Sequence, residues 1–453
     1  MKSPKLFAPN RLTEDCLCGH VISPQTPNDY KPSLGILSDK EMVMFTMHSH
    51  FESEKHVNEF GGNTYPQITH TVMYRTTDGG ETWRCCGHMP FGGVEPSVTV
   101  LDGVLLVQSS EFNHMFTNHK NYTTNIYRSD DKGKTWTDFH LTSELLGCDE
   151  NAGIYLNRTF IQLKNGDFAG FINLYRDNGR NRVLRMISKD RGKTWQFDEV
   201  TVCVKQTENP VSPVMEESVY YYTPSGRLIA VARVNWAVVH PDACAQIPHA
   251  LRQERASDID QHDGMILMES EDDGLTWKPI RGLGYFGMMY PSIVYLNDRD
   301  FVLTYTKRVS STHSPYPKVG VQAVLGRENE DGSFNIDFDH DIIIIDDCTP
   351  TYSTSGGGYG RTELLSDGTL ITPYSYRLNS EEIEDILKRD AYADDEVYLK
   401  YSQNTNQSFK CPNHAFFKTA SPDLQKYLIL EFAHEKQLSR ITTDLLKWKI
   451  DLP

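Results

Sequence analysis

Six stretches of the sequence share one pattern of apolar and polar positions: an alternating segment, a turn with Gly or Asp, and a more continuously apolar segment. Alternation with a period of two is typical of strands whose two faces differ, and continuous apolar runs suit strands covered on both faces. The copies begin at Pro32, Pro96, Arg158, Glu217, Pro291 and Arg361. Each copy therefore predicts one β-hairpin.

The spacing of these copies leaves room for a second hairpin in each. The shortest interval runs from Arg158 to Glu217 (59 residues) and the longest from Glu217 to Pro291 (74 residues). A chain of 453 residues normally divides into domains, unless it is a repeat whose core grows unit by unit. We therefore expect an all-β fold, a six-bladed β-propeller of four-stranded antiparallel blades in one domain. The expected blades are residues 30–90, 91–145, 146–203, 204–282, 283–345 and 346–412.

A short motif, S/T-x-D-x-G-x-T-W, marks the second hairpin of the first four copies. Its Asp can accept backbone N–H bonds within a tight turn, its Gly can take positive φ, and its Trp can pack beneath the hairpin. The motif is therefore a structural element and has no catalytic role. It stands at Thr76 to Trp83, Ser129 to Trp136, Ser188 to Trp195 and Ser270 to Trp277.

The two ends of the chain have to meet if the ring of blades is to close, since an open ring would expose a sheet edge. Residues 1–29 are the candidates for completing the last blade. Leu, Ile and Phe recur with helical spacing from Asp423 to Lys449. We therefore expect residues 413–453 to form a C-terminal helical segment that packs against the ring.

Composition and charge exclude several classes of function. The formal charge is −16 and no run of Lys and Arg appears, so a nucleic-acid partner is not expected. The nine Cys have neither disulfide-framework nor zinc spacing, and no run of 18 apolar residues suggests a membrane span. We expect no cofactor, no metal, no membrane partner and a cytoplasmic location, or an extracytoplasmic one if a leader has been removed. Any anionic ligand must meet local positive charge.

The octets are Asp-boxes, and Asp-boxes on a six-fold strand repeat resemble the sialidase (neuraminidase) superfamily over about residues 30 to 410. The resemblance implies an active site on the propeller axis, on the face opposite the Asp-boxes. It also implies a Tyr nucleophile paired with a Glu, an Asp as acid/base, and three Arg that bind the carboxylate of the substrate.

Three residues fit this pattern by their distance from a turn glycine. Tyr359 and Glu217 each stand nine residues before the glycine of their hairpin, as the nucleophilic Tyr and its partner Glu do in the family. Glu216 is the alternative if the register slips by one. Arg233, seven residues after the same glycine, matches one of the three arginines. A neutral Tyr suits a substrate whose anomeric carbon bears a carboxylate, because that carboxylate repels a carboxylate nucleophile. Tyr359 could instead be a core tyrosine of an inner strand.

Other positions depart from the family. Tyr30 stands where sialidases have the first arginine, and Lys318, with Arg308 nearby, stands where they have another. Lysine cannot make the planar bidentate contact of a guanidinium. Arg361 is a charge that could replace the missing arginine from another blade. These departures weaken the prediction of a substrate held by its carboxylate, but they leave the prediction of a glycosidase standing.

The segment expected to hold the acid/base, residues 49–70, contains no Asp. His48 and His50 stand at a strand end there, with both rings expected on one side, which suits sugar hydroxyls. Trp236 begins a long insertion in the fourth blade that could form a wall over the pocket or a solvated loop.

The exo-arabinanases, a related six-bladed family, offer a different assignment because they resemble this plan with a carboxylate pair in place of the Tyr. On that interpretation Glu217 is nucleophile or base, and Glu150 or Asp149 is the acid. The sequence thus predicts an exo-acting glycosidase that removes a terminal sugar, with acidic sugars among the candidates, from an oligosaccharide. The alternatives are a true exo-α-sialidase with a modified arginine set, a non-catalytic carbohydrate-binding propeller, and a uronate lyase.

Overall fold

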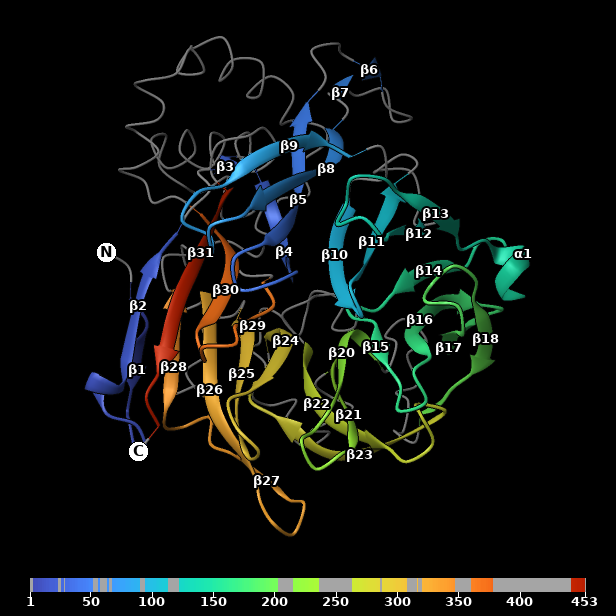
Figure 1. The fold of residues 1–453 in the computed structure, drawn as a ribbon. Helices are drawn as coiled ribbons and strands as arrows, with labels where there is room; N and C mark the ends of the chain where they lie inside the picture. The colour runs from blue at the N-terminus through green and yellow to red at the C-terminus, as the bar shows by residue number, and fades with distance from the viewer. Residues whose placement is uncertain are drawn as a thin grey trace, which may run out of the picture.

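The computed structural model describes residues 3–22, 26–27, 29–51, 56–57, 63–64, 67–89, 94–112, 122–202, 215–235, 263–285, 287–307, 316, 320–346, 360–377 and 441–452. Six antiparallel sheets are arranged radially around a common centre (Figure 1). The expected six-bladed β-propeller is therefore confirmed.

The first three blades follow one another along the chain. In the first, the strands from the centre outward are β4 (Asp29–Ile36), β5 (Met42–Phe51), β8 (Gln67–Thr76) and β9 (Arg84–His88). The second contains β10 (Val94–Leu101), β11 (Val104–Phe112), β12 (Tyr122–Ser129) and β13 (Thr137–His140). The third contains β14 (Gly153–Leu156), β15 (Ile161–Gln162), β16 (Phe168–Asp177), β17 (Arg180–Ser188) and β18 (Gln196–Glu199). The short elements between strands are β6 (His56–Val57), β7 (Asn63–Thr64) and helix α1 (Ser143–Leu146).

The fourth and fifth blades carry additional short strands at their outer edges. The fourth consists of β20 (Glu216–Tyr222), β21 (Leu228–Asn235), β22 (Asp263–Ser270) and β23 (Thr276–Leu283), with β19 (Thr201–Val202) paired parallel to β23. The fifth consists of β24 (Met288–Tyr295), β25 (Asp300–Lys307), β26 (Gly320–Glu328), β27 (Phe334–Ile336) and β28 (Ile342–Asp346), with β1 (Lys5–Phe7) paired to β28.

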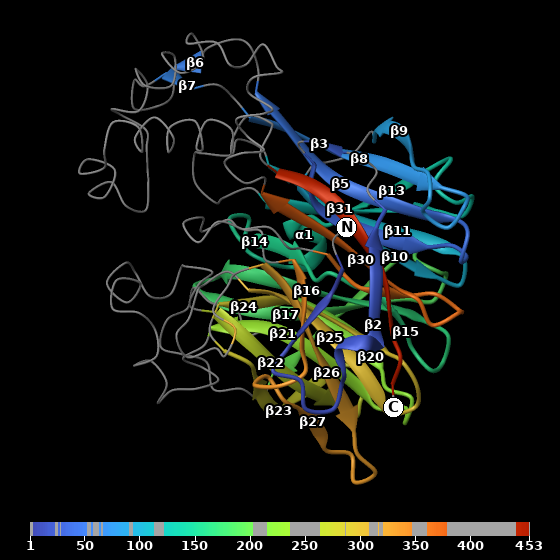
Figure 2. The same cartoon turned by 90° about the vertical axis from the view of Figure 1, so that its left-hand side faces the viewer.

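The sixth blade closes the ring with both ends of the chain, and here one expectation is wrong. Its strands are β29 (Glu363–Leu364), β30 (Leu370–Arg377), β31 (Ile441–Ile450) and β2 (Leu17–Val21), with β3 (Thr26–Pro27) also on β31 and the 3-10 turn η1 (Glu14–Cys16) before β2. Residues 441–449 are therefore a strand and not part of a helix, and the sixth blade extends well beyond residue 412. Successive side chains of β31 point to opposite faces of the blade: Leu446 and Trp448 pack in the core shared with the fifth blade, and Leu445 packs in the core shared with the first blade. The expectation that the N-terminal residues complete the last blade is confirmed, and β2 and β31 lie side by side in both views (Figures 1 and 2).

The turns at the Asp-boxes have the geometry that their residues predict. In the second blade, Asp131 accepts bonds from the backbone N–H (2.9 Å) and the hydroxyl (2.7 Å) of Thr135. These bonds hold the pKa of Asp131 well below its usual range. Lys132 and Gly133 both have positive φ (61° and 82°), which a glycine adopts without strain. All four boxes connect the third and fourth strands of a blade, at one end of the ring.

Neighbouring inner strands are linked through side-chain hydroxyls. An inner strand has one edge without a strand partner, and its N–H groups need acceptors. Ser and Thr side chains of the preceding blade supply them. The bonds are Val98 N to Ser33 Oγ (2.9 Å), Phe160 N to Thr99 Oγ1 (3.2 Å), Tyr220 N to Thr159 Oγ1 (3.0 Å) and Thr362 N to Ser292 Oγ (3.1 Å). These contacts fix the rotation of each blade against the next, and with it the positions of the residues that face the centre.

Because β2 closes the ring against β31, we expect a larger side chain at Gly19 of β2 to destabilise the fold. A Cβ atom at Gly19 would lie 2.8 Å from the Cβ of Trp448 and 3.0 Å from the carbonyl oxygen of Lys447. We expect Gly19→Val to lower the free energy of unfolding by about 1–3 kcal/mol through overpacking, measured by urea denaturation. Cys18→Val, an exposed position on the same strand, is the control and should change it by less than about 0.5 kcal/mol. Equal effects of the two changes would contradict the closure by β2.

Candidate active site

Four inner strands contain an irregularity at the same place, near their first residues. Lys31, Glu95, Glu217 and Tyr290 have φ values of 51°, 51°, 43° and 59°, a region that side chains other than Gly rarely adopt. Each lies where the pairing with the second strand of its blade shifts register. Bulges of this kind redirect a side chain, and backbone strain of about 1–3 kcal/mol persists only where the surroundings impose it. The four side chains are thus redirected at the end of the ring opposite the Asp-boxes.

These residues and two arginines form one network, which we call the axial cluster. Arg158 lies between β14 and β15 of the third blade, and Arg233 lies on β21 opposite Glu216. The axial cluster consists of Lys31, Glu95, Arg158, Glu217, Arg233 and Tyr290, which come from the first five blades.

Arg158 is the centre of the network. Its Nη2 donates to Glu95 Oε2 at 2.5 Å and to Glu217 Oε1 at 2.9 Å, so one guanidinium nitrogen joins blades two and four to blade three. The ring of Tyr290, from the fifth blade, lies 4.3 Å from its Cζ. Only 6% of the Arg158 side chain is exposed, and its Nη1 is buried without a hydrogen-bond partner among the described residues. A buried guanidinium nitrogen without an acceptor is uncommon, and this one keeps the capacity for one more hydrogen bond.

The remaining cations complete the coordination of the two carboxylates. Lys31 Nζ pairs with Glu95 Oε1, and Arg233 Nη1 donates to Glu217 Oε2 at 3.0 Å. Each carboxylate therefore contacts two cations. The side chains of Lys31, Glu217 and Arg233 are between 12% and 16% exposed, whereas Glu95 is 33% exposed. The cluster is accessible from solvent mainly beside Glu95.

These contacts fix the charge state of the cluster. Burial by itself would raise the pKa of Glu95, but the charges of Lys31 and Arg158 outweigh it and hold that pKa well below its usual range. Burial opposes ionisation of Glu217 in the same way, and Arg233 and Arg158 again lower its pKa. Burial raises the pKa of Tyr290 far above that of a free phenol. At neutral pH the cluster therefore contains two carboxylates, three cations and a neutral phenol.

The structure brings together two of the predicted site residues, Glu217 and Arg233. Both were predicted from their distance to the turn glycine of the same hairpin. Tyr30 adjoins them, because the Lys31 Nζ lies 5.4 Å from its ring centroid. Several predicted residues lie outside the described residues: Tyr359, Lys318, Arg308, Trp236 and the side chain of His50. Their roles stay predictions.

Three further predicted residues are described but are not members of the axial cluster. Arg361 donates to Glu363 Oε1 at 2.6 Å and to the Val98 carbonyl at 3.3 Å, so its charge is paired with Glu363. Glu150 is exposed in the turn before β14. His48 lies on β5 and contacts the buried carboxylate of Asp29, at 2.7 Å.

Sequence reasoning missed four members of the cluster: Lys31, Glu95, Arg158 and Tyr290. A signal was available for three of them, because Lys31, Glu95 and Tyr290 each precede the dipeptide Pro-Ser at the start of an inner strand. A proline restricts the residue before it and ends regular pairing. The recurrent x-Pro-Ser therefore marks the bulge, but only the fold shows that the three x residues face one another. Arg158 is followed by Thr and has no such signal.

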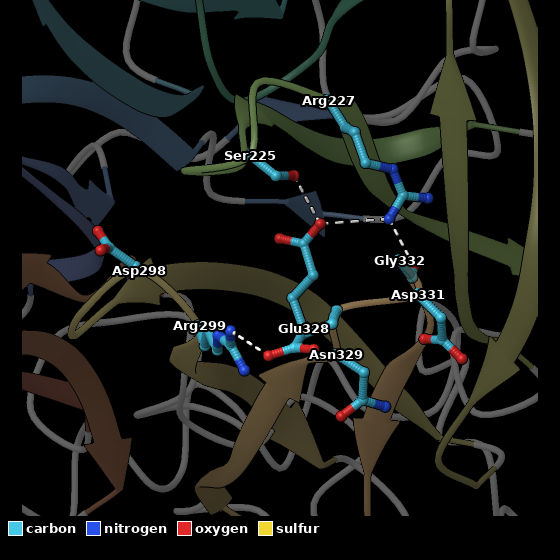
Figure 3. A pocket seen from close by; sticks show the side chains of 9 residues that line it. Ser225, Arg227, Asp298, Arg299, Glu328, Asn329, Asp331 and Gly332 are labelled. Atoms are coloured by element: carbon cyan, nitrogen blue, oxygen red, sulfur yellow. Dashed lines mark hydrogen bonds and ion pairs between the residues drawn. The ribbon is translucent and has the colours of Figure 1, made fainter.

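A polar cleft of 690 Å³ lies elsewhere in the ring, at the turn end of the fourth and fifth blades. It is lined by the β20–β21 and β24–β25 turns and the turn after β26 (Figure 3). Arg227, one of the two arginines in its lining, is already held by Glu269 (2.7 and 2.8 Å), Glu328 (3.3 Å) and the Gly332 carbonyl. Arg299 pairs with Glu330 in the same way. Because these charges are compensated within the protein, the cleft is a poor candidate for the site.

Two kinds of site find no support in the part of the chain that the structure describes. No group of three or more His, Cys, Asp or Glu side chains there is arranged to hold a metal ion. No helix among those residues has the length and apolar character needed to cross a bilayer.

Comparisons with known proteins agree with this architecture. The family model for the BNR repeat-like domain matches residues 31–303. A protein of unknown function from Dyadobacter fermentans has a similar structure, with a TM-score of 0.55 and 18% identity over 84% of this chain and 95% of that chain. The NanB sialidase from Streptococcus pneumoniae follows, with a TM-score of 0.50 and 14% identity over 81% of this chain and 67% of that one. No curated protein sequence matches the chain significantly.

The charge state of the cluster predicts how stability depends on pH. Since the pKa values of Glu95 and Glu217 are lower in the folded than in the unfolded chain, their contribution to stability is present above the unfolded pKa and is lost as the pH falls through the folded pKa. We expect the free energy of unfolding to decrease as the pH is lowered from about 5, and to decrease less steeply in Glu217→Gln. Urea denaturation at a series of pH values measures this. The exposed Glu271→Gln is the control, and a Glu217→Gln profile parallel to that of the control would contradict the assignment.

Proposed function

The chain belongs to the family of BNR repeat-like domains, and on that basis we propose that it is an exo-acting glycoside hydrolase of the sialidase-like type that removes a terminal acidic sugar from an oligosaccharide. The observation that carries the proposal is the axial cluster. Strained residues from separate blades meet there around Arg158, and strain of this kind is typical of sites that bind or react.

The balance of charge supports an anionic substrate. Lys31, Arg158 and Arg233 outnumber Glu95 and Glu217, in a chain whose formal charge is −16. The cluster is therefore a local positive region that favours an anion over a neutral ligand. The buried Nη1 of Arg158 can donate to a carboxylate oxygen of such a ligand.

The buried position of the axial cluster favours a reaction at the terminal sugar of an oligosaccharide. Its side chains are largely buried between blades, and the described members range from 6% to 33% exposed. A terminal sugar can enter a site that blades surround, whereas the middle of a polymer needs a groove open at both ends.

The carboxylates supply the chemistry in this proposal. Hydrolysis proceeds through a transition state in which the sugar ring carries positive charge, and an ionised Glu217 stabilises that charge. The charge of Glu217 can also polarise Tyr359, the nucleophile that the family resemblance implies, or Glu217 can itself act as the nucleophile. Arg158 and Arg233 keep Glu217 ionised, so removing either cation also changes the reacting carboxylate.

A uronate lyase is the second candidate, favoured by the contact of Tyr290 with Arg158. In such a reaction a phenol takes part in removing the proton from the carbon next to the substrate carboxylate. An arginine offsets the charge of that carboxylate. Tyr290 lies against the guanidinium with its phenol neutral. A lyase releases an unsaturated sugar, whose absorbance separates it from the hydrolase.

The proposal predicts turnover of simple aryl glycosides. We expect the wild-type protein to release the aryl group from at least one member of a panel made with N-acetylneuraminic acid, glucuronic acid and arabinose. Glu217→Gln should lower kcat by about 100-fold or more, because it removes the charge that the transition state requires. Release of the aryl group, followed by absorbance, measures both.

Glu269→Gln is the matched control, since both oxygens of Glu269, like those of Glu217, accept bonds from arginine, but Glu269 lies on β22 beside the polar cleft. It should leave kcat unchanged. Binding of these sugars without any released aryl group or unsaturated product would instead identify a carbohydrate-binding propeller.

A further inference from the structure

A buried carboxylate lies beside the axial cluster on the first blade. Asp29, at the beginning of β4, is fully buried. It accepts bonds from Thr46 Oγ1 at 2.9 Å, Tyr74 OH at 2.5 Å and His48 Nδ1 at 2.7 Å. Three strands of one blade thus converge on a single side chain.

The partners of Asp29 fix the orientation of His48. Both hydroxyl groups donate to Oδ2, which leaves Oδ1 for the imidazole. Burial and the charge of Asp29 raise the pKa of Tyr74, so its phenol keeps its proton and stays a donor. Nδ1 of His48 therefore carries hydrogen and faces the carboxylate. Nε2 is then the ring nitrogen that can exchange a proton with a bound ligand.

The backbone places this pair close to the cluster. Asp29 precedes Tyr30 and Lys31 directly, and it lies opposite His48 in the register of β4 and β5. The strand is irregular at Lys31, but Asp29 still places His48 opposite a residue only two positions from a cluster member. A sugar bound at Lys31 would therefore lie near the imidazole, whose side chain is 24% exposed.

The cluster itself has no group suited to moving a proton near neutral pH. The pKa values of Glu95 and Glu217 are held low by two cations each, and the pKa of Tyr290 is raised by burial. Glycoside hydrolysis needs a proton for the departing oxygen, above all when the leaving group is a sugar. The group that supplies it must lie beside the described cluster members and not among them.

We propose that His48, oriented by Asp29, is the proton donor of the site. His48 Nε2 gives its proton to the glycosidic oxygen as the bond between that oxygen and the anomeric carbon breaks. The neutral imidazole then accepts a proton from the water that adds to the anomeric carbon, which restores the starting state. This inference rests on the proposed hydrolase and assigns Asp29 as a positioning residue.

Other titratable groups surround the imidazole on the same face of the blade. His70 of β8 is the cross-strand partner of His48, and its ring is stacked on that of His88 of β9 at 4.6 Å. The His88 ring lies 5.9 Å from the His48 ring. Because His70, His88, Tyr74 and Asp29 all lie around His48, a pH profile alone would not separate their contributions. The acidity of the leaving group is the sharper test.

The experiment uses paired substrates, the phenyl and dinitrophenyl glycosides of the same three sugars. Dinitrophenolate departs without protonation, whereas phenolate requires it. We expect His48→Gln to lower kcat for the phenyl glycoside by about 100-fold or more and to change kcat for the dinitrophenyl glycoside by less than about threefold. Asp29→Asn should give the same pattern with a smaller loss.

His140→Gln, on the outer strand of the second blade, is the control and should affect neither substrate. Retained dinitrophenyl turnover shows that a variant is folded. His48→Asn, whose amide can still donate toward Asp29, replaces the Gln variant if that protein does not fold. Equal losses with both substrates in a folded variant would overturn the role of His48 and leave the hydrolase standing. No turnover of any glycoside by the wild-type protein would overturn the hydrolase, and with it this role.

Discussion

The sharing of one guanidinium by two carboxylates is the interaction on which the rest of the site depends. Arg158 draws Glu95 and Glu217 from blades on either side of it to the same nitrogen. Without that cation the two carboxylates would face each other with only Lys31 and Arg233 to offset their charge. Each carboxylate would then keep one cation, and nothing would hold the two carboxylates together against their mutual repulsion. The same contact keeps both acids ionised, so the geometry of the site and its chemistry have a common origin.

The propeller makes that arrangement possible by imposing backbone conformations that an isolated strand would not adopt. The residues at positive φ are held between the second strand of their own blade and the inner strand of the next, through hydroxyl bonds such as that of Ser33 to Val98. The ring must also be closed for these constraints to act, and the pairing of β2 with β31 provides the closure. Strain at the axis is therefore balanced by packing and hydrogen bonding at the periphery.

The sequence predicted the ring because its evidence is local and repeated, as with the Asp-boxes around Asp131 and the hairpin at Glu217. It failed at the last strand, where the apolar spacing of residues 441–449 suits a helix as well as a strand and only the pairing with β2 and β30 decides. For the site, register against a turn glycine identified Glu217 and Arg233. Arg158 could not be found in this way, since its role arises from its neighbours in space and not from its neighbours along the chain.

The central claim is that the axial cluster recognises the negative charge of a sugar through Arg158. Calorimetric titration of the wild-type protein with glucuronic acid, N-acetylneuraminic acid and their uncharged methyl esters tests it most directly, with Arg158→Met as the comparison. We expect that at least one acid binds, that its ester binds at least about tenfold more weakly, and that this difference disappears in Arg158→Met. Equal affinity for acid and ester in the wild-type protein, or an unchanged preference in the variant, would contradict it.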